Sequence, residues 1–195
     1  MKRMTYQEYI DYNVRKNSDP AFREKLIKNR QKKVAFFVDK FRKLGLGYEA
    51  KAILCLGARM GEEVEAFNVL GAEAIGLDLV PYPPLVREGD MNNIALDSTF
   101  DVVYTNSFDH VYDIADWVVN VRRVLNPGGV LILSLFPEIF DGHDEEEEVA
   151  YVEGKDEALA ILGRHLRLVR VETDTPQWFK QYTEEIYLYA KDAHE

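Results

Sequence analysis

Residues 51–61 read KAILCLGARMG, a short apolar run that ends in a turn containing two glycines. A continuous apolar run of this length is typical of a strand buried on both faces of a parallel sheet. The next residues carry Val64, Phe67 and Leu70 at helical spacing, which predicts a helix over 62–70. The stretch therefore predicts the strand–turn–helix unit from which α/β folds are built.

The segments that follow repeat this alternation. Strands are predicted over 74–78, 100–105 and 130–135, and an amphipathic helix over 114–125. The tetrapeptide Asn126-Pro127-Gly128-Gly129 predicts a turn between that helix and the last of these strands. Alternating strands and helices of this length predict an α/β fold with a doubly wound, mostly parallel sheet.

The C-terminal part departs from this pattern. A helix-like segment at 157–165 is followed by two β-prone segments, 166–171 and 185–190, with no helix-sized segment between them. These segments predict an antiparallel hairpin, whose loop contains Pro176, Trp178 and Phe179.

The N-terminal part is predicted to be helical. Ser18-Asp19-Pro20 combines a capping side chain with proline at a first helical position, and Gly45 and Gly47 are expected to end the helix. We expect one structural domain, in which residues 1–47 form a helical extension and residues 48–195 the main α/β domain.

The composition is that of a soluble globular protein with one core. The chain has 195 residues, of which 47% are hydrophobic and 30% charged. No apolar run approaches the ~20 residues that a membrane-spanning helix needs, and the first residues lack the apolar core of a signal peptide. Cys55 is the only cysteine, which excludes an internal disulfide and a cysteine zinc cage. A cytoplasmic location is expected.

The formal net charge of −10 disfavours duplex nucleic acid as a partner, because an acidic surface repels phosphate backbones. A basic stretch over 23–43 and an acidic run over 144–148 are both expected to be solvated. Because the acidic run follows the predicted strand 130–135, it is also placed to border a ligand pocket. No metal site is expected from His143 and the acids of 141–148, since consecutive acids point in different directions.

Three features are placed where α/β sheets bind nucleotides, after the carboxyl ends of strands. The Gly57–Gly61 turn allows close approach of a ligand to backbone amides, although such turns also use glycine for structure alone. Asp78 ends the next predicted strand, where a carboxylate can bind a ribose diol or cap a turn. Asp90, followed by Met91, can accept a hydrogen bond from an adenine amino group or serve as a turn residue.

Five segments together resemble class I S-adenosylmethionine (SAM)-dependent methyltransferases, the type 11 group in particular. They are ILCLGARMGEEV, AIGLDLVP, REGDMNN, FDVVYTNSFDHVYD and VRRVLNPGGVLIL, in the family's order and spacing. The resemblance covers about residues 50–136, with a compatible tail. It implies a Rossmann-like fold and SAM as cofactor, and it does not identify the substrate.

The resemblance also implies roles for individual residues. It places three turn residues along the methionine part of SAM: Gly57, Ala58 and Gly61. Asp78 is expected to bind the ribose hydroxyls, Leu79 to pack on the adenine, and Asp90 and Met91 to recognise the adenine edge. After the predicted strand 100–105, Asn106 and Ser107 are expected near the amino-acid end and the sulfonium. Asp109, a further expected cofactor residue, precedes His110 where the family usually carries an acid or histidine followed by histidine.

Two positions depart from the family pattern. Cys55 stands where the family carries an acid that commonly holds the SAM ammonium group, and Glu62, Glu63 or Asp109 are its candidate replacements. Arg59 stands at a glycine position. It is expected either to reach the SAM carboxylate, as a further cofactor residue, or to pair with a helix glutamate.

Methyl transfer from a sulfonium depends mainly on alignment of the reacting atoms. Where a general base is needed, His110 is the candidate, because its unperturbed pKa is near neutral; the alternative is a structural role in its loop. Tyr112 and Asp113 are weaker candidates. Three N-terminal tyrosines are expected either to cover an acceptor site or to pack in the core: Tyr6, Tyr9 and Tyr12.

Three functions compete. The leading hypothesis is a methyltransferase acting on a small molecule or a protein side chain. The second is a SAM-fold protein without catalysis, serving as a binding or regulatory partner, for which Cys55 and Arg59 leave room. The third is a nicotinamide-dependent oxidoreductase, which predicts glycine at the centre of the turn and does not account for Asp90 or the antiparallel tail.

Overall fold

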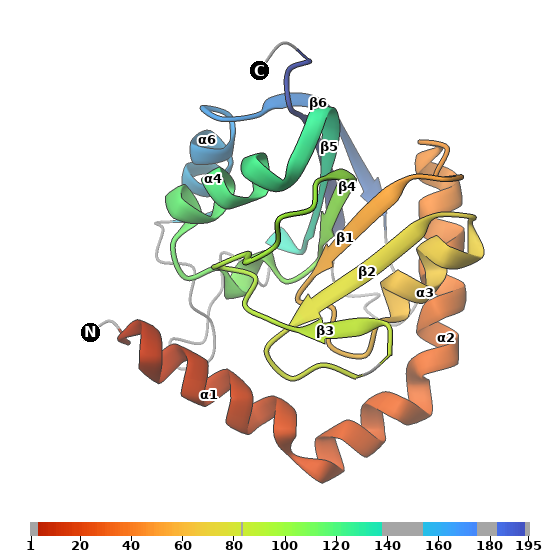
Figure 1. Cartoon of the computed structure of the whole chain (residues 1–195), viewed down its shortest axis with the longest axis vertical. Helices are drawn as coiled ribbons and strands as arrows, with labels where there is room; N and C mark the ends of the chain where they lie inside the picture. Colours follow the sequence, from red (N-terminus) through yellow and green to blue (C-terminus); the bar gives the residue numbers. More distant parts are fainter. Residues whose placement is uncertain (1–3, 83, 138–153, 175–182, 194–195) are drawn as a thin grey trace. The chain divides into compact units, whose positions relative to one another are not determined.

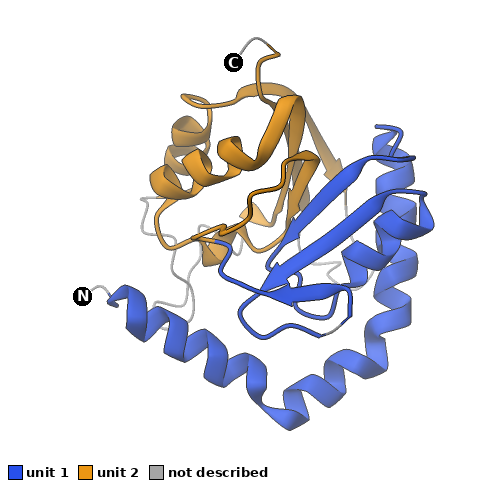
Figure 2. Ribbon diagram, in the orientation of Figure 1, with its two compact units in different colours: residues 1–91 blue, residues 92–195 orange. Residues whose placement is uncertain are grey.

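The computed structural model describes residues 4–82, 84–137, 154–174 and 183–193. The acidic run with His143 and the hairpin-loop residues Pro176, Trp178 and Phe179 lie outside these residues. The chain divides into two compact units, residues 1–91 and residues 92–195 (Figure 2). Each unit is described by itself below.

Unit 1 contains three parallel strands in the order β3-β2-β1. They are β1 (Ala52–Leu56), β2 (Glu73–Asp78) and β3 (Val86–Glu88) (Figure 1). The residues Ile53–Leu56 are fully buried, as the continuous apolar run predicted. β3 was not predicted from the sequence, because it has three residues and only Val86 of these is buried.

The helices of unit 1 are α1 (Tyr6–Ser18), α2 (Pro20–Leu44) and α3 (Glu62–Val69). The predicted start signal is confirmed: Asp19 caps α2 by accepting a hydrogen bond from the Phe22 N–H (2.7 Å). Gly45 ends α2 in the left-handed region with φ 65°. α2 packs against α3, and the rings of Phe41 and Phe67 stack there with centroids 3.8 Å apart.

The prediction that the basic stretch 23–43 is solvated is wrong for several of its members. Lys40 is 2% exposed. Arg30 pairs with Glu65 of α3 (2.5 Å) and donates to the Met60 carbonyl (3.0 Å). Arg30 thus binds an acid of α3 and a carbonyl of the loop before it, and the Lys40 ammonium lies 5.7 Å from the centroid of the Phe37 ring. These charges take part in packing instead of facing solvent.

Unit 2 contains four strands in the order β4-β5-β7-β6. They are β4 (Phe100–Thr105), β5 (Leu125–Leu135), β6 (Arg167–Asp174) and β7 (Glu184–Ala190). β4 and β5 are parallel, whereas β7 is antiparallel to both β5 and β6. The predicted C-terminal antiparallel pair is confirmed.

The described helices of unit 2 are the 3-10 helix η1 (Phe108–His110), α4 (Ile114–Val124) and α6 (Lys155–Leu162). α4 packs against α6, and Figure 1 shows the two side by side. The buried residues of α4 recur at helical spacing: Ile114, Trp117, Val118, Val121 and Val124.

The predicted turn at 126–129 is wrong, because these residues lie inside β5. Leu125 pairs with Phe100 and Val130 with Val102, so residues 126–129 form an irregular insertion in the ladder. The main chain of Lys191 bonds this insertion on both sides, accepting from the Gly128 N–H (3.1 Å) and donating to the Gly129 carbonyl (3.0 Å). The Asn-Pro-Gly-Gly sequence therefore bulges a strand instead of joining a helix to it.

The α/β fold class is confirmed, with parallel strands, the C-terminal antiparallel hairpin and the N-terminal helices. The boundary predicted at residue 47 stays a prediction. Among the described residues, no helix is long and apolar enough to cross a membrane.

Candidate functional site

The loop between β1 and α3 is held against the end of β2. The N–H groups of Gly57 and Ala58 both donate to the Leu77 carbonyl (2.9 and 3.2 Å). A Cβ placed on Gly76 of β2 would lie 2.7 Å from the Ala58 Cβ, so glycine at 76 permits this close packing. Gly57 and Gly61 have φ of 70° and 69°, which glycine adopts without strain.

Arg59 has a backbone conformation that favours glycine, with φ 35°. Its N–H donates to Oδ2 of Asp78 (2.9 Å), and its carbonyl accepts from the Tyr82 N–H (2.9 Å), so both neighbouring segments hold this residue in place. The guanidinium carbon lies 5.5 Å from the centroid of the Phe22 ring of α2, a cation–π contact. The charge of Arg59 also lowers the pKa of Glu63 at the start of α3.

Both carboxylate oxygens of Asp78 accept backbone hydrogen bonds. Oδ2 accepts from Arg59 as described, and Oδ1 accepts from the Val80 N–H (2.8 Å). An ionised carboxylate offers about four acceptor positions. Asp78 is half-buried, so it fixes the loop and retains acceptor capacity toward a ligand. Leu79, the next residue, is also half-buried.

Asp90 and Met91 follow β3. The Gly89 N–H donates to the Asp78 carbonyl (2.9 Å), which joins this segment to the end of β2. The Tyr6 hydroxyl of α1 donates to Oδ2 of Asp90, and Met91 is 6% exposed. Unit 1 therefore brings together the predicted residues Gly57–Gly61, Asp78, Leu79 and Asp90 at the carboxyl ends of its strands.

Two adjacent acids at the start of α3 are buried beside this loop. Glu62 is 5% exposed and lies 3.5 Å from the Lys33 ammonium of α2. Glu63 is 3% exposed, and burial, reinforced by Glu62, raises its pKa from 4.5 to about 8. Burial and the charge of Glu63 also raise the pKa of the Cys55 thiol. A buried carboxyl group therefore lies near Cys55, the position where the family carries an acid.

In unit 2, the predicted residues follow β4. The Ser107 N–H donates to Thr105 Oγ1 (3.1 Å), and Ser107 Oγ lies 3.4 Å from Asn106 Oδ1. In η1, Nε2 of His110 lies 3.9 Å from Oδ2 of Asp109, and each side chain is 24% exposed. The backbone N–H of His110 donates to the Ser107 carbonyl (3.1 Å), which joins the two pairs, and all four residues of these pairs are half-buried.

The two weaker candidates for acid–base chemistry have structural contacts. Asp113 caps α4, because its Oδ1 accepts from the N–H groups of Ala115 (3.0 Å) and Asp116 (3.1 Å). The Tyr112 N–H donates to Asn92 Oδ1 (2.8 Å). Within the part of the chain that the structure describes, no group of three or more His, Cys, Asp or Glu residues could hold a metal ion.

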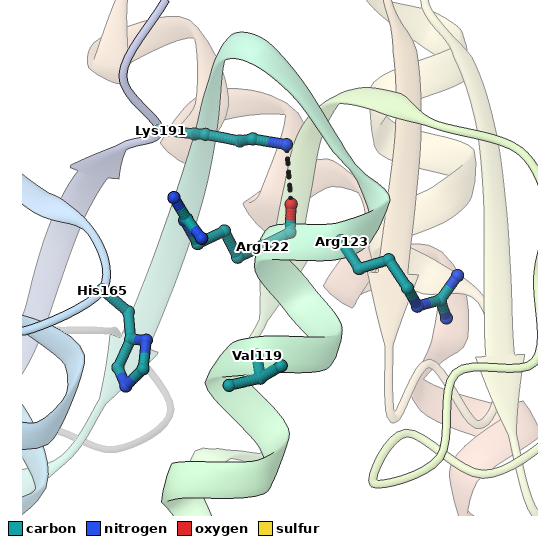
Figure 3. Close-up of a pocket in the computed structure, with 5 residues that line it drawn as sticks. All are labelled: Val119, Arg122, Arg123, His165 and Lys191. Carbon is teal, nitrogen blue, oxygen red and sulfur yellow. Dashed lines mark hydrogen bonds between the residues drawn. The ribbon is translucent and has the colours of Figure 1, made fainter. Parts of the chain in front are cut away.

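Unit 2 also has a cavity of about 350 Å³, near the end of α4 where β5 begins (Figure 3). Its lining is Val119, Arg122, Arg123, His165 and Lys191. The Lys191 ammonium donates to the carbonyls of Arg122 (2.9 Å) and Leu125 (2.7 Å) at the end of α4. Arg123 points away from His165 (Figure 3), and its guanidinium donates to two carbonyls before β4. These cations do not converge on one point, and we assign no ligand to this cavity.

Sequence reasoning found the polar residues that follow β1, β2 and β4, because they stand next to apolar runs. It named Glu63 only as one of three replacements for the missing acid. The surroundings of Glu63 depend on segments distant in the chain, because its pKa responds to charges from Lys33 of α2 and from Arg59 of the loop. The sequence signal for it was limited to its position two residues after Gly61.

Residues 54–133 match the family model described as "Methyltransferase domain". A search of curated protein sequences found no match. Among solved structures, the chain is similar to a 1,6-didemethyltoxoflavin-N1-methyltransferase from Burkholderia thailandensis, with a TM-score of 0.70 and 14% identity. That similarity covers 98% of this chain and 92% of the other, whose structure contains bound 1,6-didemethyltoxoflavin and S-adenosylhomocysteine.

Two further structures support the same fold. An S-adenosylmethionine dependent methyltransferase from Mesorhizobium loti has a TM-score of 0.61 and 16% identity, covering 74% of this chain and 93% of that one. The N-methyltransferase NodS from Bradyrhizobium japonicum has a TM-score of 0.60 and 15% identity, covering 90% and 99%. Residues 54–133 therefore match the methyltransferase domain, and the chain has the fold of class I SAM-dependent methyltransferases.

Proposed function

We propose that this chain transfers the methyl group of SAM to a small molecule or a protein side chain. The observation that carries the proposal is the bond between the Arg59 N–H and Asp78, which joins the β1–α3 loop to the acid that ends β2. Nucleotide ligands of α/β sheets bind at the carboxyl ends of strands. A loop and an acid held together there form the base of such a site.

In unit 1, the cofactor residues are proposed as follows. The loop residues Gly57, Ala58 and Gly61 line the methionine part of SAM, and Arg59 contributes the loop conformation through its backbone contacts. Asp78 accepts the ribose hydroxyls with the acceptor positions that its two backbone bonds leave open. Leu79 packs on the adenine. Asp90 and Met91 bind the adenine edge.

Glu63 is proposed to replace the acid that Cys55 has displaced. Its carboxyl group is buried and its pKa is raised, which means that the protein alone offers its charge too little compensation. The ammonium group of SAM is a cation that would supply this compensation. Glu62 is less suited, because its Oε1 lies 3.5 Å from the Lys33 ammonium. The charges of Lys33 and Arg59, by contrast, lower the pKa of Glu63 by less than burial raises it.

In unit 2, Asn106, Ser107 and Asp109 are proposed for the amino-acid end of SAM. When bound, SAM supplies an electrophilic methyl group on a sulfonium centre. His110 is proposed to take a proton from the acceptor where the acceptor atom carries one, with Asp109 beside its Nε2 stabilising the protonated ring. The remaining acceleration comes from positioning the acceptor atom in line with the methyl group.

A small-molecule acceptor has the better support. Two of the similar structures are named N-methyltransferases, and one of these contains its small-molecule ligand 1,6-didemethyltoxoflavin.

The proposal is tested by calorimetric titration of the chain with SAM and with S-adenosylhomocysteine. We expect both to bind, and we expect Asp78→Ala to raise the Kd at least ~10-fold, since hydrogen bonds to a charged group contribute about 1.5–3 kcal/mol. Asp19→Ala is the matched control, because it also removes a carboxylate that accepts a backbone N–H, at the start of α2.

Four outcomes would contradict the proposal or part of it. If neither SAM nor S-adenosylhomocysteine binds, SAM-dependent catalysis is refuted. Binding of NAD in their place would support the oxidoreductase. Equal losses of affinity in the Asp78 and Asp19 variants would remove Asp78 from the site. A non-catalytic partner would bind SAM but form no S-adenosylhomocysteine with a panel of amine, hydroxyl and thiol acceptors.

A further inference from the structure

The strand β6 is exposed to an unusual degree for a strand of a folded core. It is the outer strand of the order β4-β5-β7-β6, with β7 as its paired neighbour among the described strands. Three of its apolar residues are exposed: Leu168 (47%), Val169 (53%) and Val171 (44%). β7 is buried along almost its whole length. A hydrophobic edge strand is a ready template for pairing with another strand.

The charges of β6 are separated by sign along the strand. Arg167 and Arg170 lie in its first half, and Glu172 and Asp174 in its second half. An antiparallel pair of two identical strands places the first half of one opposite the second half of the other. This arrangement therefore brings arginine opposite acid at both ends, whereas a parallel pair brings like charges together.

We propose that β6 pairs antiparallel with β6 of a second copy of this chain, forming a two-fold symmetric dimer. When Val171 lies opposite Val171 of the second copy, Arg170 lies opposite Glu172 of that copy. By symmetry, Glu172 lies opposite Arg170 of that copy. The register one residue further along places Glu172 opposite Glu172 of the second copy, so the charges favour the register centred on Val171. Such a self-complementary edge is the form that a two-fold interface requires.

The contacts within one chain are compatible with this pairing. Nε of Arg170 lies 3.0 Å from Oε1 of Glu172 on the same strand. In the dimer, Arg170 and Glu172 of the two copies would surround the two-fold axis, with positive and negative charges alternating. The register shift between Leu168 and Arg170 leaves residues 170–174 in regular pairing with β7. These residues therefore form the straight part of the edge, and the proposed pair is centred within them.

The dimer is tested by sedimentation analysis of the full chain over a concentration series. We expect the wild type to be dimeric and Arg170→Glu and Glu172→Arg each to be monomeric, because each places like charges opposite one another. The double variant R170E/E172R restores opposite charges across the axis and should restore the dimer. Val171→Lys should give a monomer, whereas Val119→Lys, which changes an exposed valine of α4 (53%), should leave the dimer unchanged.

Circular dichroism verifies that each variant is folded. A wild type that stays monomeric at every concentration would overturn the proposal. It would also be overturned by a folded double variant that stays monomeric, or by equal effects of the lysine substitutions at 171 and 119. SAM titration of the same samples is a separate readout, since β6 contains none of the proposed cofactor residues.

Discussion

The Tyr6 hydroxyl donates a hydrogen bond to Oδ2 of Asp90, 84 residues later in the chain. Tyr6 also stacks on Tyr9, with ring centroids 5.9 Å apart, and Tyr9 is 3% exposed. The first turn of α1 is therefore attached to the segment after β3, which carries the residues proposed for the adenine. The helix α1 is thus hydrogen-bonded to Asp90, an acid that is also proposed to bind the cofactor.

Tyr6→Phe removes this hydrogen bond and keeps the ring. We expect faster amide hydrogen exchange in α1 and a loss of about 1 kcal/mol or less in the free energy of unfolding, the usual contribution of one hydrogen bond. Tyr12→Phe is the control, because the Tyr12 ring lies beneath Arg15 of its own helix. Equal exchange rates in both variants would show that the Tyr6 hydroxyl does not hold α1.

Phe67→Ala tests the packing of α2 on α3. Phe67 and Phe41 are both fully buried and stacked, so truncation removes a large apolar contact and leaves a cavity. We expect the free energy of unfolding to fall by about 3–5 kcal/mol in chemical denaturation. Val69→Ala, on the same helix but 58% exposed, should cost far less. A similar small loss in both variants would contradict the role assigned to this contact.

The elements that the sequence predicted well are those with a local cause. The apolar run 53–56 is a fully buried strand, and Asp19 caps α2, because both depend on neighbouring residues in the chain. The elements that it missed depend on distant segments. β3 forms by pairing with β2, and residues 126–129 stay in β5 because Lys191 bonds to them.

The candidate site shows the same division. The position of Asp78 at the end of a strand was predicted from its neighbours, whereas the strand β3 before Asp90 was not predicted. The hydrogen bonds that these two acids accept come from Arg59, Val80 and Tyr6, and no sequence pattern indicated these donors. Glu63 is likewise buried at the start of α3, near Cys55 of β1 and within reach of the Lys33 charge, which periodicity within one helix does not reveal.

Glu63 predicts a pH dependence of stability. Its pKa is about 8 in the folded chain, against 4.5 for an unperturbed group. Between these values the unfolded state has released the proton while the folded state keeps it, so the free energy of unfolding falls as the pH rises. Below about 4.5 both states are protonated and the contribution is fully present. At 1.36 kcal/mol per pKa unit, the loss by about pH 8 is at most about 5 kcal/mol.

Glu63→Gln keeps the size of the side chain and removes the titration. We expect chemical denaturation at about pH 5 and about pH 8 to show a smaller decline in the variant than in the wild type. Glu24→Gln, which changes an exposed acid of α2, should decline as the wild type does. If the Glu63 and Glu24 variants decline equally, Glu63 is already ionised in the folded chain.

The proposed role of Glu63 also predicts that SAM binding releases a proton. At about pH 6.5 the ammonium group of SAM is charged, since α-amino groups titrate near 7.7–8.0, and Glu63 is protonated. An ion pair between them requires Glu63 to lose its proton. Calorimetry in buffers of different ionisation enthalpy should therefore show a release that approaches one proton per SAM bound.

Adenosine serves as the control ligand, because it has the ribose and adenine but no ammonium group. Its binding should release no proton, and Glu63→Gln should abolish the release with SAM while weakening its affinity. Binding of SAM by the wild type without proton release would exclude Glu63 as the partner of the ammonium and leave the rest of the site intact. The negative charge that pairs with the SAM ammonium group would then come from Glu62 or Asp109. The loss of SAM affinity in Glu62→Gln and in Asp109→Asn would show which of the two supplies it.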